Sequence, residues 1–265
     1  MTSASGAFQT ADTCRIAWRT DGDASNPPLM LANSLGTNLA MWDPQIEAWS
    51  KHYFVIRHDM RGQGASQVAA SGFGIDRFAR DMLGLLDHLE IATCDFVALS
   101  LGGMVGQYLG THAPERLGRM VLANTSAYMG PPESWDARIA AVRSNGMAAI
   151  AGAVVERWFT PEFRAASAEP ARILAMLLAT DSEGYAAACT AIRNMDQRAT
   201  VTGIDVPTLV IGGTKDPATP PDHAEFLAAA ISSATLKMVP AAHLSNIECP
   251  EQFSQLVLNF MGSTH

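Results

Sequence analysis

The sequence is poor in cysteine, and the few cysteines it has form no pattern. Only four occur in 265 residues, and they lie far apart: Cys14, Cys94, Cys189 and Cys249. Neither a C-x-x-C pair nor a mixed cysteine and histidine spacing is present. Disulfides and a structural zinc site are therefore not expected.

Basic charge and long apolar runs are also scarce. With 18 lysines and arginines against 26 aspartates and glutamates, the net charge is −8, which leaves no basic surplus for nucleic acid. No run of about 18 apolar residues occurs, and the first residues lack the basic patch and apolar core of a signal peptide. We expect a cytoplasmic protein that binds neither nucleic acid nor membrane. An anionic small molecule remains possible if a local arginine receives it.

Short apolar runs alternate with longer amphipathic stretches, in a chain of ordinary globular composition with 48% hydrophobic residues. The runs lie at 53–59, 95–100, 119–125, 207–214 and 235–241. A helix is predicted over about 75–90, where apolar residues recur at helical spacing. This rhythm indicates an α/β fold with a mostly parallel central sheet and helices on both faces.

The rhythm stops between residues 131 and 198. This stretch opens around GPPESW, becomes rich in alanine and helical in pattern, and offers no convincing strand. We predict a helical cap inserted at 131–198 that lies over the strand ends. Residues 1–130 and 199–265 would then form one core.

One serine ends a buried run. In ALSLGG, Ser100 closes an apolar run and precedes a helix that must end before Pro114. A nucleophile at such a turn needs small residues two positions away on either side, because the two backbones approach closely there. The chain supplies Ala98 and Gly102. Ser100 is therefore a candidate nucleophile, and the alternative is a serine that only caps the following helix.

A serine nucleophile needs a base, usually a histidine that a carboxylate orients, in the chain order Ser, acid, His for hydrolases with this turn. Asp216 and His243 each follow a predicted strand, so both are expected at the same sheet edge as Ser100. The other histidines lack this combination of order and place: His52, His58, His88, His112, His223 and His265. Of the rival acids, Asp222 is placed at the N-cap of the next helix, and Glu248 is too close in sequence to His243.

The tetrahedral intermediate of acyl transfer needs amide donors for its oxyanion. One donor is expected from the backbone N–H of Leu101, directly after the nucleophile. The second is expected in the loop NSLGTN after an early apolar strand, where Leu35 offers the best-placed N–H. An ordinary turn of asparagine, serine and glycine is the alternative for that loop.

Several motifs together are similar to one known family. They are ALSLGG, NSLGTN followed by MWDPQ, RHDMRGQG, RWFTPEF in the predicted cap, and AAHLSNIECPEQF near the end. With them the chain resembles the 3-oxoadipate enol-lactonases of the α/β-hydrolase superfamily over nearly its whole length. The resemblance implies an α/β-hydrolase fold with Ser100, Asp216 and His243 as the catalytic residues. It also implies opening of a small anionic lactone through an acyl-enzyme, in the β-ketoadipate pathway of aromatic-compound catabolism, with no metal or organic cofactor.

Two positions depart from the superfamily pattern. Ala98 stands where the first glycine of G-x-S-x-G is usual, which could alter the strain at the turn. Gln63 stands where RGHG is common. We interpret the turn around Gln63 as structural, with Asp59 and Arg61 satisfying backbone groups of the loop.

A lactone of this kind carries a free carboxylate, which the fork geometry of an arginine suits. Trp135 and Arg138 lie three apart in PPESWDARIAAVR, hence on one helix face, and are the predicted substrate-binding pair. Arg143 and Arg157 are the competitors, and a solvated arginine on the cap is the alternative. Two aromatic residues are expected to pack the cap against the core: Trp158 and Phe159.

Other functions stay open at this point. A broad carboxylesterase or a non-haem perhydrolase would use the same catalytic side chains. A ligand-sensing receptor with the hydrolase fold would bind a small molecule and signal through its cap. A haloalkane dehalogenase is disfavoured, because its nucleophile at this turn would be an aspartate rather than Ser100. The sequence leaves the oligomeric state open.

Overall fold

One sheet runs through the computed structural model of the protein, which describes residues 2–68 and 72–262. Over these residues eight strands pair in the order β1-β2-β4-β3-β5-β6-β7-β8. Their bounds are β1 Ser3–Gln9, β2 Arg15–Asp21, β3 Pro28–Ala32, β4 Phe54–His58, β5 Cys94–Leu99, β6 Leu117–Ala123, β7 Thr208–Gly213 and β8 Ala234–Val239. β2 is antiparallel to both of its neighbours, whereas the strands from β3 to β8 run parallel. The prediction of a mostly parallel sheet is confirmed.

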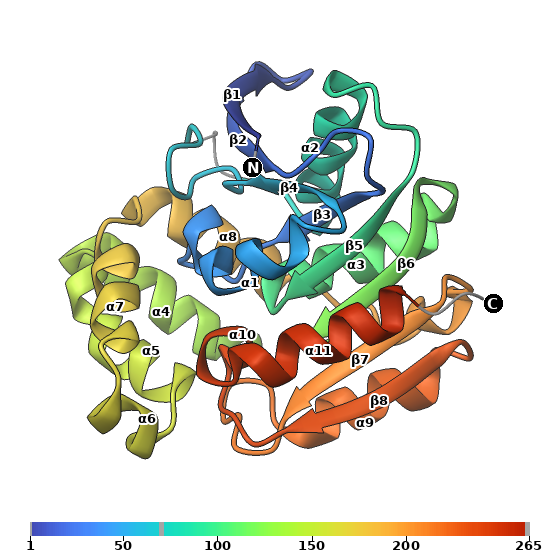
Figure 1. Cartoon of the computed structure of the whole chain (residues 1–265). Coiled ribbons are helices and arrows are strands. Elements are labelled where there is room, and N and C mark those ends of the chain that lie inside the picture. Colours follow the sequence, from blue (N-terminus) through green and yellow to red (C-terminus); the bar gives the residue numbers. More distant parts are fainter. Residues whose placement is uncertain (1, 69–71, 263–265) are drawn as a thin grey trace.

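The central strands are mostly apolar because helices cover both faces of the sheet. Val97, Ala98 and Leu99 of β5 are fully buried, as are residues 29–32 of β3. Figure 1 shows α1 (Asp43–Trp49) and α11 (Pro250–Met261) in front of the sheet, with α3 (Leu101–His112) and α9 (Pro221–Ala230) behind it. Burial on both faces favours the continuous apolar runs seen in the sequence. Every run predicted to be a strand becomes one.

The helices of the core also follow the sequence pattern. The helix expected over about 75–90 is α2 (Ile75–His88), which packs against α3, and α3 itself ends before Pro114. β1 was not visible in the sequence, because nearly all of its residues are exposed and no buried alternation marks it. None of the helices in the described part of the chain is long and apolar enough to span a bilayer.

Helices and turns, without any strand of the sheet, occupy the described segment between β6 and β7 up to residue 193. The α-helices are α4 (Pro132–Asn145), α5 (Ala151–Trp158), α6 (Pro161–Ala166), α7 (Glu169–Leu178) and α8 (Ser182–Arg193), and Figure 1 shows them gathered to one side. The chain enters and leaves this segment side by side, because Tyr128 forms a β-bridge with Asp196. We keep the name cap for residues 131–198. Its separation from a core of 1–130 and 199–265 stays a prediction.

Candidate active site

Ser100 stands at the turn between β5 and α3 in a left-handed backbone conformation, with φ of 57° and ψ of −115°. Its N–H donates to the Ala123 carbonyl at 2.9 Å, and its carbonyl accepts the Thr125 hydroxyl at 2.7 Å. A strained residue of this kind is held by its surroundings and is typical of functional turns. The Ser100 hydroxyl makes no capping hydrogen bond to α3, so the interpretation of Ser100 as only a helix cap is wrong.

The residues around the turn are as small as the packing requires. A Cβ on Gly102 would lie 2.3 Å from the carbonyl oxygen of Ala32, and one on Gly103 would lie 2.6 Å from Cβ of Thr125. Such approaches are far inside van der Waals contact, so α3 can lie this close to β3 and to the segment after β6 only with glycine at these positions. Ala98 is buried in β5 beside Ala32 of β3. Its methyl group therefore has room in the sheet.

Asp216 and His243 meet at the same edge of the sheet, as predicted. Asp216 follows β7 and His243 follows β8, and Nδ1 of the imidazole lies 2.8 Å from Oδ2 of the carboxylate. Both residues are buried. An ionised carboxylate only accepts hydrogen bonds, so Nδ1 carries the proton that is shared with Asp216, and Nε2 is the nitrogen left to act as a base.

The surroundings of Asp216 keep it ionised. Oδ1 accepts the backbone N–H groups of Ala218 and Thr219, while Oδ2 accepts the Thr219 hydroxyl at 2.7 Å and the Asn124 side-chain amide at 2.9 Å. Burial alone raises the pKa of Asp216, but the charge of His243 and these hydrogen bonds outweigh it and hold the pKa at about 2. Asp216 is therefore a fixed anion at neutral pH.

Asn124 is a site residue that the sequence reading missed. It follows β6 in a left-handed conformation with φ of 42°. Its amide nitrogen also donates to the Ala242 carbonyl at 3.2 Å, and its amide oxygen accepts the Ser245 hydroxyl at 2.5 Å. Asn124 thus fixes Asp216 and the loop that carries His243 to each other. The available signal was a polar residue at the end of the buried run 119–125.

The rival acids have other positions. Asp222 lies in the first turn of α9, whose N-cap is Pro220, so the prediction of an N-cap aspartate is wrong. Two consecutive prolines start this helix, and the fixed φ of Pro221 suits its first helical position. Glu248 accepts hydrogen bonds from the backbone of Ala242 and Thr160 and makes none to His243. His265, set aside in the sequence as terminal, lies outside the described residues.

The predicted oxyanion donors lie beside the nucleophile. Leu35 follows β3 and lines a cavity together with Ser100, and Leu101 is the first residue of α3. Within the described part of the chain, neither backbone N–H is hydrogen-bonded to another residue. Two amide donors near a serine hydroxyl are the arrangement that stabilises a tetrahedral oxyanion.

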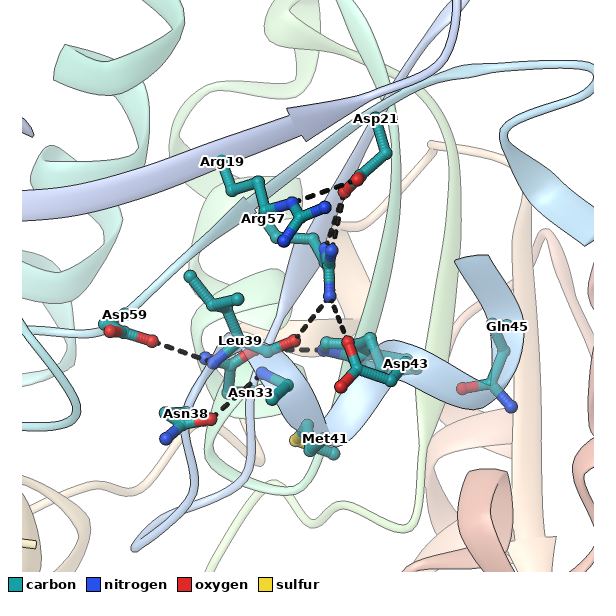
Figure 2. A network of polar contacts seen from close by, with 12 residues as sticks. Arg19, Asp21, Asn33, Asn38, Leu39, Met41, Asp43, Gln45, Arg57 and Asp59 are labelled. Atoms are coloured by element: carbon teal, nitrogen blue, oxygen red, sulfur yellow. Dashed lines mark hydrogen bonds and ion pairs between the residues drawn. The ribbon is translucent and has the colours of Figure 1, made fainter. Parts of the chain in front are cut away.

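Charged and polar groups clamp the loop that carries Leu35. Figure 2 shows Arg57 of β4 donating to Asp21, to Asp43 and to the Leu39 carbonyl, while Asp59 accepts the Leu39 N–H at 2.8 Å. Arg57 is buried. A buried guanidinium with all these acceptors fixes the segment after β3 relative to β2 and β4.

The RHDMRGQG turn braces the same loop. The side-chain oxygen of Gln63 accepts the N–H of Gly36, the residue after Leu35, so this turn touches the predicted oxyanion loop. Asp59 satisfies backbone groups, as predicted. Arg61 does not, because it pairs with the carboxylates of Asp81 and Asp12. That part of the prediction is wrong.

A cavity of about 220 Å³ joins the sheet edge to the cap. On the sheet side it is lined by Ser34, Leu35, Ser100, Met104, Pro217, Ala218 and His243. On the cap side and its base it is lined by Met129, Gly130, Ser134, Trp135, Arg138, Val154, Arg157, Trp158, Tyr185 and Ile192. Ser100 and His243 therefore face the same space as the predicted substrate-binding pair.

Two arginines give the cap side of the cavity its charge. The Arg138 guanidinium lies 4.8 Å from the centroid of the Trp135 ring, a cation–π contact that places both as predicted. Within the described residues neither Arg138 nor Arg157 forms an ion pair with a carboxylate. Burial, together with the charge of Arg138, lowers the pKa of Arg157. Positive charge without a protein counter-ion indicates a site for an anion.

Three further cap residues were singled out in the sequence, and not all of them have the predicted role. Arg143 pairs with Glu183 on the surface, at 3.1 Å, and does not line the cavity. Phe159 is buried and stacks on Phe163 within the cap. Trp158 lines the cavity, so its role is wider than the packing predicted for it.

Comparison with known proteins shows the family to which the chain belongs. The family model of the alpha/beta hydrolase fold matches residues 27–250. The 3-oxoadipate enol-lactonase 2 of Acinetobacter baylyi (strain ATCC 33305 / BD413 / ADP1) is 41% identical over 249 residues, which cover 94% of this chain and 93% of the relative. This chain belongs to the 3-oxoadipate enol-lactonase family of α/β-hydrolases. The sequence resemblance and the expectation of a hydrolase are confirmed.

Solved structures agree with this enol-lactonase assignment. The crystal structure of the enol-lactonase from Burkholderia xenovorans LB400 has a TM-score of 0.95 and is 39% identical, covering 97% of this chain and 100% of that one. A hydrolase from Pseudomonas aeruginosa PA01 also has a TM-score of 0.95 and is 45% identical, covering 98% of both chains. The enol-lactonase family and its fold thus extend over essentially the whole protein.

Proposed function

We propose that this protein hydrolyses 3-oxoadipate enol-lactone to 3-oxoadipate, a step in aromatic-compound catabolism by the β-ketoadipate pathway. One observation carries the proposal. A single cavity is lined by Ser100 and His243 on one side and by Arg138 and Arg157 on the other. A reactive serine facing guanidinium groups that have no carboxylate partner among the described residues suits an ester that also carries a carboxylate. The relatives named for this activity support the same substrate.

The first step of the proposed reaction forms an acyl-enzyme. Nε2 of His243 takes the proton of the Ser100 hydroxyl while Oγ attacks the lactone carbonyl. The backbone amides of Leu35 and Leu101 hold the oxyanion, and losing one such donor typically costs about 10²–10³ in rate. Asp216, fixed as an anion, orients the imidazole and stabilises its protonated form.

Ring opening keeps every atom of the substrate on the enzyme. The bond between the carbonyl carbon and the ring oxygen breaks, and the imidazolium of His243 returns its proton to that oxygen. The leaving group is an enol in the same molecule, which relaxes to a ketone. A water molecule deprotonated by His243 then attacks the Ser100 ester, releases 3-oxoadipate and restores the free serine.

The cap holds the far end of the substrate in this proposal. Arg138 binds the free carboxylate of the lactone, with the ring of Trp135 as the adjoining apolar wall. Arg157, which faces the same cavity, supplies a second positive charge. Because charge-assisted hydrogen bonds from a guanidinium are strong, this contact should govern capture of the substrate more than the chemistry.

The test is incubation with freshly generated enol-lactone while the loss of its ultraviolet absorbance is followed. Rapid turnover that is abolished in Ser100→Ala is the expected result. Turnover of simple aryl esters without turnover of the lactone would instead indicate a general esterase. Tight binding of the lactone without any turnover would indicate a sensor.

A further inference from the structure

The carboxylate of Glu248 joins the loop of His243 to the cap. Glu248 ends the short helix α10 (Ser245–Glu248). Its Oε2 accepts the backbone N–H of Ala242, the residue before His243, at 2.9 Å. Its Oε1 accepts the backbone N–H of Thr160 at 3.2 Å and also the Thr160 hydroxyl. One side chain therefore holds two segments that are far apart in the sequence.

A second hydrogen bond joins the same two segments. The N–H of Leu244, the residue after His243, donates to the carbonyl of Trp158 at 3.0 Å. Trp158 and its neighbour Arg157 line the cavity. Both neighbours of His243 are thus linked to the part of the cap that forms the cavity wall, one directly and one through Glu248.

The charge of Glu248 is used for these contacts alone. Among the described residues no lysine or arginine forms an ion pair with it. Its donors are instead two backbone amides and a hydroxyl. Hydrogen bonds to an ionised acceptor are about twice as strong as those between neutral groups. A carboxylate at this position is therefore a firm connection between core and cap.

We propose that Glu248 is a positioning residue. It fixes the position of His243 relative to Arg157 and Trp158, which form the cap side of the cavity. The inference rests on the proposed function, because it concerns a substrate held by the cap while His243 acts on it. A small neutral ester, which needs only Ser100, His243 and the oxyanion donors, should not depend on the link between Glu248 and Thr160. Turnover of the anionic lactone should depend on this link, because the cap holds its carboxylate.

Thr160 offers a matched pair of variants that test the link without touching the cavity. Thr160→Val keeps the shape of the side chain and removes the hydroxyl that donates to Glu248, whereas Thr160→Ser keeps the hydroxyl. We expect Thr160→Val to lower kcat/KM for the lactone by about tenfold, the size of one charged hydrogen bond. The same variant should change kcat/KM for 4-nitrophenyl acetate by less than about twofold, and Thr160→Ser should behave as the wild type on both substrates.

Glu248→Gln is the second variant, because the Thr160 hydroxyl also accepts the N–H of Phe163 and caps α6. It weakens the hydrogen bond to Ala242, beside His243, as well as those to Thr160 in the cap. The value of kcat should therefore fall on both substrates and fall further on the lactone. Equal losses on the two substrates in both variants would overturn the proposal, as would full lactone activity in Thr160→Val and Glu248→Gln. Turnover of the lactone by the wild type is measured first and decides the proposed function separately.

Discussion

The two sides of the cavity are built differently. On the sheet side, the buried carboxylate of Asp216 is surrounded by donors from Asn124, Ala218, Thr219 and His243. On the cap side, the guanidinium groups of the lining arginines have no carboxylate partner within the described residues. The Asp216 carboxylate has all its partners without a ligand, whereas the cap presents charge that only a ligand can neutralise. Reaction chemistry thus belongs to the first side and substrate recognition to the second.

This contrast assigns different kinetic signatures to the two sides. Changes at the sheet edge should lower kcat for every ester, because they alter groups that act on the reacting carbonyl. Changes in the cap should raise KM for anionic substrates and leave neutral esters unaffected.

The largest effect is expected from Asp216→Asn. An amide at this position can donate to Nδ1 and favours the wrong tautomer of His243, so kcat should fall by about 10⁴ on the lactone and on aryl esters alike. Steady-state kinetics on both substrates is the measurement. Asp222→Asn, the control at the rival acid, should keep full activity. Comparable losses in the two variants would remove Asp216 from its assigned role.

Arg138→Ala should act on recognition. Losing one charge-assisted contact of about 1.5–3 kcal/mol should raise KM for the lactone about 10- to 100-fold, with kcat for 4-nitrophenyl acetate unchanged. Arg143→Ala is the matched control, since Arg143 pairs with Glu183 away from the cavity. A larger increase of KM in Arg157→Ala than in Arg138→Ala would move the carboxylate to Arg157.

Gly102→Ala should reduce stability through overpacking at the turn. The added methyl group would lie 2.3 Å from the Ala32 carbonyl oxygen, and we expect the free energy of unfolding to fall by about 1–3 kcal/mol in urea titrations. Gly152→Ala is the control, because a Cβ there meets nothing within 4 Å. If the two alanine variants are equally stable, the close approach of α3 to β3 is not as described.

The smallest effect is the pH dependence of stability. The folded-state pKa of Asp216, about 2, is below its ordinary value of 3.8. Its contribution to stability is therefore fully present above about pH 4 and is lost as the pH falls towards 2. The free energy of unfolding of the wild type should fall more between pH 4 and pH 2 than that of Asp216→Asn, as measured by urea titrations at each pH. Parallel curves for the two proteins would contradict this assignment.

Sequence order predicted the sheet side well, because the carboxyl ends of parallel strands must meet at one edge. That rule brought Ser100, Asp216 and His243 together without any knowledge of their distances. It could not show that Asn124 reaches Asp216, nor that Gln63 turns toward Gly36, because these contacts depend on side-chain orientation between distant segments.

The cap was harder to read from the sequence. Helical spacing placed Trp135 and Arg138 on one face, and the structure shows that this face lines the cavity. The same spacing gave no way to separate Arg143, which faces solvent, from Arg157, which faces the cavity, because they lie on different helices. The direction in which each helix packs decides such cases, and composition does not encode it.

Covalent labelling of Ser100 combined with lactone kinetics is the most direct test that one serine performs the reaction. An aryl phosphonate should modify the protein once, on the peptide that contains Ser100, and lactone turnover should fall in proportion to the labelled fraction. Peptide mass spectrometry gives the site and the fraction, and the ultraviolet assay gives the turnover. A protein fully labelled at Ser100 that still opens the lactone at the wild-type rate would show that the reaction takes place elsewhere.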